Sequence, residues 1–223
     1  MTTASTVTFT TAKGEAGAYF ARPGEGTPGV VVIQEWWGLV PHIEDIARRF
    51  AAQGYLALAP DLYHGKRTLD AEEAEHLMKG LDWGRAAAEI AGAVDYLRKQ
   101  GATRVGLVGF CMGGALTVVG AAQANVDGYV AFYGFPPAGA VRLENVRAPG
   151  LLFFGEHENF FSVPDARAFA ATQTSRGLGT EVVVYPGAGH AFFNDARPEA
   201  CCEDAANDAW RRTLAFFGEH LRG

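Results

Sequence analysis

The chain has 223 residues, 48% of them hydrophobic, so it is long enough to bury the core of one α/β domain. Its 19 Lys and Arg against 25 Asp and Glu give a formal net charge of −6, and no basic run could follow a phosphate backbone, which argues against a nucleic-acid partner. The sequence lacks the pattern of a signal peptide and any apolar run long enough to span a bilayer. We therefore expect a cytoplasmic, monomeric protein with a single domain over residues 1–223 and no membrane partner.

Strand patterns alternate with helix patterns along the chain. Two extended stretches at residues 6–10 and 17–21 predict an antiparallel hairpin at the edge of a sheet. Further strands are expected at residues 29–34, 55–63, 104–110, 128–134, 150–156 and 180–187. Helices are expected at residues 43–50, 69–80, 83–101, 115–124, 165–177 and 203–221. This alternation predicts an α/β fold with a mostly parallel central sheet and helices on both faces.

The stretch VGLVGFCMGG, residues 105–114, contains a cysteine at the turn from a strand into a helix. Gly109 and Gly113 stand two positions on either side of Cys111, which is the spacing of a nucleophile elbow with a thiol in place of the hydroxyl. Small residues are needed there because the strained turn brings the strand and the helix close together. The N-terminus of the helix would favour the thiolate. The alternative interpretation is a buried, inert cysteine in a glycine-rich turn.

Two later loops contain side chains that could act with such a nucleophile. Glu156 ends one predicted strand and Glu158 follows it, and His190 follows the next strand. The chain order of nucleophile, acid and histidine is that of α/β-hydrolases. The remaining cysteines, Cys201 and Cys202, are adjacent, which is poor geometry for a mutual disulfide, so we expect reduced thiols. The spacing of Cys and His does not indicate a metal site, and we expect no cofactor.

These residues resemble the dienelactone hydrolase family, the carboxymethylenebutenolidase-like α/β-hydrolases with a Cys-His-acid triad. The resemblance covers nearly the whole chain and rests on the stretches VVIQEWWGL, GYLALAPDLY, VGLVGFCMGGAL, AFYGF and YPGAGHAFF. It implies a hydrolase of esters or lactones with Cys111 as nucleophile and His190 as its base. It further implies that Glu35 is a buried glutamate in contact with the resting thiol. The backbone N–H groups of Trp36 and Met112 would form the oxyanion hole.

The third member of the implied triad stays open between three carboxylates. The family usually has an aspartate, and alignment on Gly155 places Glu158 at that position. Because the loop before Pro164 is longer than the family pattern, Glu156 or Asp165 could serve instead.

The substrate-binding residues also depart from the family pattern. Members that act on dienelactone hold the substrate carboxylate with a pair of arginines, but Asn194 occupies one of these places and residues 69–81 contain no arginine. We therefore expect neutral esters or lactones to be hydrolysed at least as well as a dienelactone. Aromatic side chains in the loops at the strand ends predict an apolar pocket. The residues expected to contact the small-molecule substrate are Trp37, Tyr63, Trp83, Tyr133, Phe192 and Asn194.

Glu35 is expected to be buried, since it lies between an apolar run and a pair of tryptophans. A buried carboxylate needs a donor or takes up a proton, and we expect the thiol of Cys111 to be that donor, with a cation such as Arg22 as the alternative. The expected reaction is acyl transfer through a thioester on Cys111. The competing interpretation is a non-hydrolytic redox-sensing or binding protein on the same scaffold.

Overall fold

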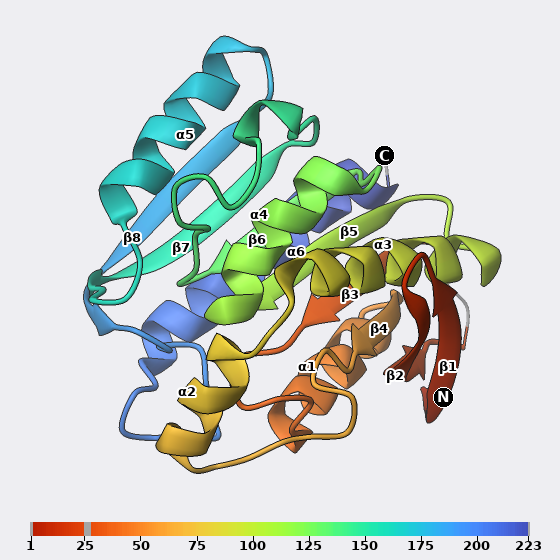
Figure 1. Ribbon diagram of the computed structural model, residues 1–223. Helices are drawn as coiled ribbons and strands as arrows, with labels where there is room; N and C mark the ends of the chain where they lie inside the picture. Colours follow the sequence, from red (N-terminus) through yellow and green to blue (C-terminus); the bar gives the residue numbers. More distant parts are fainter. Residues whose placement is uncertain (1, 25–27, 223) are drawn as a thin grey trace.

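The computed structural model describes residues 2–24 and 28–222. Its centre is an eight-stranded sheet in the order β1-β2-β4-β3-β5-β6-β7-β8 (Figure 1). The strands are β1 (Thr3–Thr11), β2 (Gly14–Arg22), β3 (Gly29–Ile33), β4 (Leu56–Pro60), β5 (Val105–Phe110), β6 (Gly128–Phe132), β7 (Gly150–His157) and β8 (Thr180–Gly189). Strands β3 to β8 run parallel, and β1 and β2 form the predicted antiparallel hairpin at one edge.

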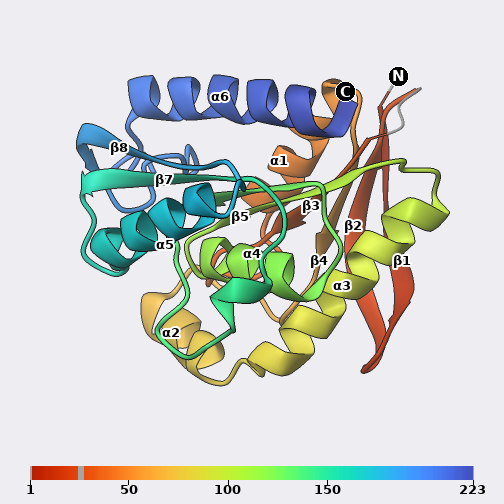
Figure 2. The ribbon, with the colours of Figure 1, turned by 90° about the horizontal axis from the view of Figure 1, so that it is seen from above.

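Helices cover both faces of this sheet, which confirms the predicted architecture (Figure 2). They are α1 (Pro41–Ala52), α2 (Ala71–Lys79), α3 (Trp83–Lys99), α4 (Met112–Gln123), α5 (Val163–Ser175) and α6 (Glu203–Arg222), with a short 3₁₀ helix η1 (Leu143–Asn145). Helices α1 and α6 lie on one face, and α3, α4 and α5 lie on the other (Figure 2). No helix in the described part of the chain is long and apolar enough to cross a membrane.

The central strands are buried on both sides, as their unbroken apolar sequences predict. In β3 every residue is buried. Val31 and Ile33 pack in the core beneath α3 and α4, whereas Val30 and Val32 pack in the core beneath α1 and α6. This alternation follows from the two-residue period of a strand. The ends of these strands are therefore held rigidly between two cores.

Helix α4 begins earlier than predicted, directly after Cys111. The glycines that suggested a loop form its first turn, where they allow close packing against the sheet. A Cβ on Gly113 would lie 2.3 Å from the carbonyl oxygen of Gln34, and one on Gly114 would lie 2.6 Å from that of Phe132. Tertiary packing thus outweighs the low helix propensity of glycine.

Candidate active site

The predicted catalytic residues lie where the parallel strands end. Cys111 directly follows β5, Tyr133 follows β6, Glu158 follows β7 and His190 follows β8. Glu35 lies two residues beyond the end of β3. Because the carboxyl ends of parallel strands share one edge of the sheet, residues far apart in the sequence meet there.

Cys111 has the backbone of a nucleophile elbow. Its φ of 55° and ψ of −118° lie outside the regions that a residue with a side chain normally adopts. Its N–H donates to the carbonyl oxygen of Phe132 at 3.0 Å, which fixes the turn to the neighbouring strand. The approach of strand and helix is so close that a Cβ on Gly109 would lie 2.2 Å from the carbonyl oxygen of Gly113. The packing on both sides thus holds the cysteine in a strained conformation.

The environment of the thiol favours its neutral form. Burial raises the pKa of Cys111 well above its ordinary range, and the negative charges of Glu35 and Glu158 raise it further. The backbone N–H groups of Met112 and Trp36 act in the opposite direction and lower the pKa of this thiol in part. Amides near a sulfur stabilise negative charge that develops there.

His190 is paired with Glu158. Its Nδ1 lies 2.9 Å from Oε2 and 3.0 Å from Oε1 of that carboxylate, whose side chain is 1% exposed. The backbone N–H groups of Phe160 and Phe161 also donate to Oε1, at 2.8 Å and 3.3 Å. Since a carboxylate only accepts, the proton of a neutral His190 lies on Nδ1, and Nε2 has a free lone pair. This is the arrangement of an oriented general base.

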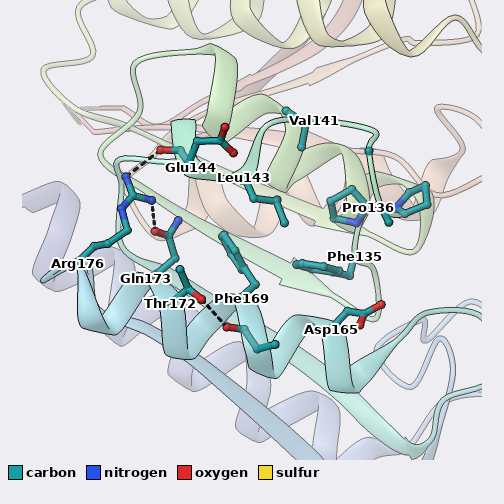
Figure 3. Close-up of a pocket in the computed structure, with 14 residues that line it drawn as sticks. Phe135, Pro136, Val141, Leu143, Glu144, Asp165, Phe169, Thr172, Gln173 and Arg176 are labelled. Atoms are coloured by element: carbon teal, nitrogen blue, oxygen red, sulfur yellow. Dashed lines mark hydrogen bonds between the residues drawn. The ribbon is translucent and has the colours of Figure 1, made fainter.

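The other two candidate acids lie elsewhere. Glu156 is exposed, and its Oε2 accepts from the backbone N–H of Gly187 at 2.8 Å. Asp165 lies in the first turn of α5 and lines a groove of about 430 Å³ between α5 and the loop after β6 (Figure 3). Of the three carboxylates left open by the sequence, Glu158 is the one that contacts His190.

Glu35 is 1% exposed, and its hydrogen bonds differ from the expected ones. Oε1 accepts from the hydroxyl of Tyr133 at 3.1 Å, and Oε2 accepts from Nδ2 of Asn194 at 2.6 Å. Among the described residues, neither the Cys111 thiol nor Arg22 is hydrogen-bonded to it. Burial raises the pKa of Glu35, although the charges of two histidines and these hydrogen bonds lower it in part. In this structure Glu35 therefore acts on the Cys111 thiol through its charge and not through a hydrogen bond.

Several residues expected to contact substrate are instead buried. Asn194 is 3% exposed, and its side chain holds Glu35. Phe192 lies fully in the core against Tyr185, and Tyr133 is also fully buried. Trp37 is packed in the core beneath the guanidinium of Arg197. The sequence showed that these residues follow strand ends but not that the chain turns their side chains inward.

Tyr63 and Trp83, also expected to contact substrate, differ in burial. Tyr63 is buried, and its hydroxyl donates to Sδ of Met112 at 3.3 Å, whereas Trp83 is half-buried at the start of α3. The rings of Phe160 and Phe161 lie 4.6 Å and 5.9 Å from the ring of His190. Phe160 is 70% exposed, which is unusual for a large apolar side chain. We expect an apolar part of a substrate to contact Phe160 beside the histidine.

One histidine–carboxylate pair near the site was not identified from the sequence. His42 lies in α1, and its Nδ1 is 3.1 Å from Oδ1 of Asp195. A histidine in an amphipathic helix has no local pattern that distinguishes it, and its partner is 153 residues away. Asp195 directly follows Asn194, which is the only sequence signal that could have pointed to this pair. Within residues 2–24 and 28–222, no group of three or more His, Cys, Asp or Glu side chains is arranged as a metal site.

Comparison with known proteins identifies the family. The sequence model of the dienelactone hydrolase family matches residues 16–221. Protein usf of Aquifex pyrophilus is 36% identical to this chain, and the alignment covers 91% of this chain and 93% of that protein. An Aquifex aeolicus protein provisionally named carboxymethylenebutenolidase is 30% identical, and its alignment covers 92% of this chain and 93% of that protein. A crystal structure from Klebsiella pneumoniae, provisionally named a dienelactone hydrolase, superposes with a TM-score of 0.85 at 28% identity over 98% of this chain and 99% of that one. The chain belongs to the dienelactone hydrolase family and, as an α/β-hydrolase of this family, is an ester or lactone hydrolase.

Proposed function

We propose that this enzyme hydrolyses small neutral carboxylic esters or lactones by acyl transfer to Cys111. The observation that carries the proposal is the pairing of His190 with the buried Glu158 at the sheet edge where Cys111 also lies, with the backbone N–H groups of Trp36 and Met112 lowering the pKa of its thiol. These parts correspond to a base, its orienting acid, a nucleophile and a pocket for an oxyanion.

In the first half-reaction, Nε2 of His190 takes the proton of the Cys111 thiol while the sulfur attacks the ester carbonyl carbon. The carbonyl oxygen becomes an oxyanion, and the N–H groups of Trp36 and Met112 stabilise it. When the tetrahedral intermediate collapses, the bond to the leaving oxygen breaks, and that oxygen takes the proton from Nε2. An alcohol leaves, and the acyl group remains on the sulfur as a thioester.

In the second half-reaction, Nε2 of His190 takes a proton from water, and the resulting hydroxide attacks the thioester carbonyl. The same two N–H groups stabilise the second oxyanion. Its collapse breaks the carbon–sulfur bond, the sulfur recovers the proton from His190, and a carboxylic acid leaves. Glu158 acts throughout by holding His190 in one tautomer and stabilising its cationic form.

The charges around the thiol support a neutral substrate. Besides burial, the negative charges of Glu35 and Glu158 raise the pKa of the Cys111 thiol. Asn194, at the place of a family arginine, is occupied by its hydrogen bond to Glu35. An anionic substrate would therefore approach negative groups, without the guanidinium pair that could compensate for them.

An activated phenyl ester of a short acid tests this proposal. The enzyme should release a burst of phenol equal to the enzyme concentration, followed by steady turnover, because acylation precedes hydrolysis. Cys111→Ala should abolish both phases, whereas Cys201→Ala should retain them. Hydrolysis that survives in Cys111→Ala would overturn the proposal and favour the redox-sensing interpretation.

A further inference from the structure

A groove of about 430 Å³ lies between α5 and the chain segment that follows β6 (Figure 3). None of Cys111, Glu158 and His190, all in the described part of the chain, lines it. Its walls are mainly apolar and include Phe135, Pro136, Val141, Leu143, Ala168 and Phe169. Its volume lies within the range of sites for small organic ligands, roughly 300–1,000 Å³. The groove is therefore a candidate binding site apart from the proposed catalytic groups.

Gln173 is a polar residue on the apolar face of α5. The buried residues of this helix are Ala166, Phe169, Ala170 and Gln173, which recur at intervals of three or four and so share one face. Gln173 is 0% exposed and lines the groove. Packing alone favours an apolar side chain at such a position. A buried amide needs hydrogen-bond partners for both its oxygen and its nitrogen.

Arg176 fixes the orientation of this amide. Its Nη1 donates to Oε1 of Gln173 at 2.6 Å, and its Nη2 donates to the carbonyl oxygen of Glu144 at 2.8 Å. Because a guanidinium only donates, the amide oxygen must face Arg176 and the amide nitrogen must face away from it. This nitrogen, Nε2, is buried and has no hydrogen-bond partner among the described residues. Figure 3 shows it on the side of Phe169 and Leu143, at one end of the groove.

The polar side chains at this end of the groove offer donors. Nε2 of Gln173 has its N–H groups free, and the exposed Arg176 adds a positive charge and further N–H groups. The acidic neighbour Glu144 is paired with Arg142 at 2.9 Å. The other acidic residue of the lining, Asp165, lies in the first turn of α5, whereas Arg176 is its C-cap, a separation of about 16 Å along the helix. A negatively charged acceptor therefore fits the end formed by Gln173 and Arg176.

We propose that this groove binds a monocarboxylic acid with an extended apolar chain. The carboxylate accepts from Nε2 of Gln173 and lies beside the guanidinium of Arg176, so it supplies the partner that the buried amide lacks. The chain runs along α5 over Phe169 and Phe135, whose ring centroids are 5.5 Å apart, towards Asp165 (Figure 3). Burial of the chain against these apolar walls favours binding, and the charge of Asp165 disfavours a second carboxylate at the far end.

Binding in this groove does not depend on the proposed hydrolysis. A carboxylic acid is also the product of that reaction, but the groove lies apart from Cys111, and its occupancy is measured without turnover. The burst experiment at Cys111 and the binding experiment at Gln173 can therefore fail separately.

Isothermal titration calorimetry with octanoate, octanol and octylamine tests the charge of the ligand. The three probes share one chain and differ in the terminal group. The intact enzyme should bind octanoate most tightly, because only this probe presents a charged acceptor to Gln173 and Arg176. Tighter binding of octylamine, or equal binding of octanoate and octanol, would overturn the proposal. So would a lack of saturable binding, since solvent would then be the partner of the amide.

Variants at the donor end locate the bound probe. Gln173→Leu keeps an apolar face on α5 but removes the donor, so the affinity for octanoate should fall roughly 10-fold or more, as expected for loss of a hydrogen bond to a charged group. Gln173→Glu should also weaken binding, because it places a second carboxylate at this end. Arg176→Gln, at an exposed position, should weaken binding and keeps the test informative if the Gln173 variants do not fold.

Arg167→Gln is the matched control, since Arg167 is an exposed arginine of the same helix that does not line the groove. It should bind octanoate as tightly as the wild type. Wild-type affinity in both Gln173→Leu and Arg176→Gln would place octanoate elsewhere on the enzyme and overturn the proposal. An equal loss of affinity in Arg167→Gln and Arg176→Gln would overturn it as well, because the effect would then reflect net charge and not this site.

Discussion

At the scale of single residues, two carboxylates near one thiol differ in the groups that hold them. Glu158 contacts the imidazole of His190 and backbone N–H groups, whereas Glu35 contacts a phenol and an amide side chain. The first arrangement orients a base. The second supplies hydrogen-bond donors to a buried carboxyl group. In the proposed mechanism Glu158 acts in each turnover, whereas Glu35 takes no part in the steps.

Glu158→Gln tests the first of these roles. The amide keeps the volume but removes the charge that stabilises cationic His190, and it lets the ring adopt the wrong tautomer. We expect kcat for a phenyl ester to fall by about 10²- to 10⁴-fold with KM little changed. Glu156→Gln, near the end of β7 and bonded to Gly187, is the matched control and should remain active. Equal losses in the two variants would show that Glu158 is not the triad acid.

Substrate charge gives a second prediction at this scale. A neutral aryl ester should show a kcat/KM at least equal to that of a dienelactone or of an ester with a free carboxylate, because acidic groups surround the thiol. The comparison requires leaving groups of matched pKa. A strong preference for the anionic substrate would contradict the prediction and would point to a cation such as Lys66 or Arg67 as its partner.

The sequence limits what could be predicted about these residues. Cys111 and His190 could be proposed because each lies in a local pattern beside a strand end. The choice among Glu156, Glu158 and Asp165 could not be made, because the pairing of β7 with β8 shifts register between Gly155 and His157 and so changes which side chain points to the histidine. The partners of Glu35 are 98 and 159 residues away, so no local pattern indicates them.

At the scale of elements, the turn from β5 to α4 positions Cys111, the proposed nucleophile. The strands and most helices were predictable from periodicity, because their buried faces repeat every second residue or every third and fourth residue. The first turn of α4 was not, because its glycines are selected for contact with neighbouring strands rather than for helix formation. Close approach of backbone to backbone is a tertiary property that a single-sequence pattern does not contain.

Gly113→Ala tests this packing. The added methyl group would lie 2.3 Å from the carbonyl oxygen of Gln34 and 2.5 Å from that of Ile33, and both are backbone atoms that cannot move independently. We expect a loss of about 1–3 kcal/mol in the free energy of unfolding, with a larger loss of activity because Cys111 and Trp36 are displaced. Gly179→Ala, where an added Cβ meets nothing within 4 Å, is the control for urea denaturation and activity. Equal stabilities of the two variants would contradict this account.

At the scale of the whole molecule, the buried Glu35 should make stability depend on pH. Its pKa is raised in the folded protein from an ordinary value of 4.5, chiefly by burial. Between that value and the raised one, the folded state binds more protons than the unfolded state. The free energy of unfolding therefore falls as the pH rises through this range.

Glu35→Gln should have a flatter stability profile than the wild type. Loss of a hydrogen bond to Tyr133 or Asn194 lowers stability equally at every pH, but the variant lacks the group that is destabilising when ionised. The stability of Glu35→Gln relative to wild type should therefore increase as the pH rises above 4.5 towards the raised pKa of Glu35, as measured by urea denaturation. Parallel profiles over this range would show that Glu35 does not titrate differently in the folded protein.

The most direct test of the central claim is the mass of the enzyme during turnover. Rapid acid quench of a reaction with an activated short-chain ester, followed by intact-protein and peptide mass spectrometry, should show one acyl group on Cys111. Hydroxylamine should remove this group, as expected for a thioester, and Cys111→Ala should carry none. In Glu158→Gln the adduct should still identify Cys111 but form more slowly. Turnover without an acyl adduct, or an adduct on another residue, would contradict the proposed mechanism.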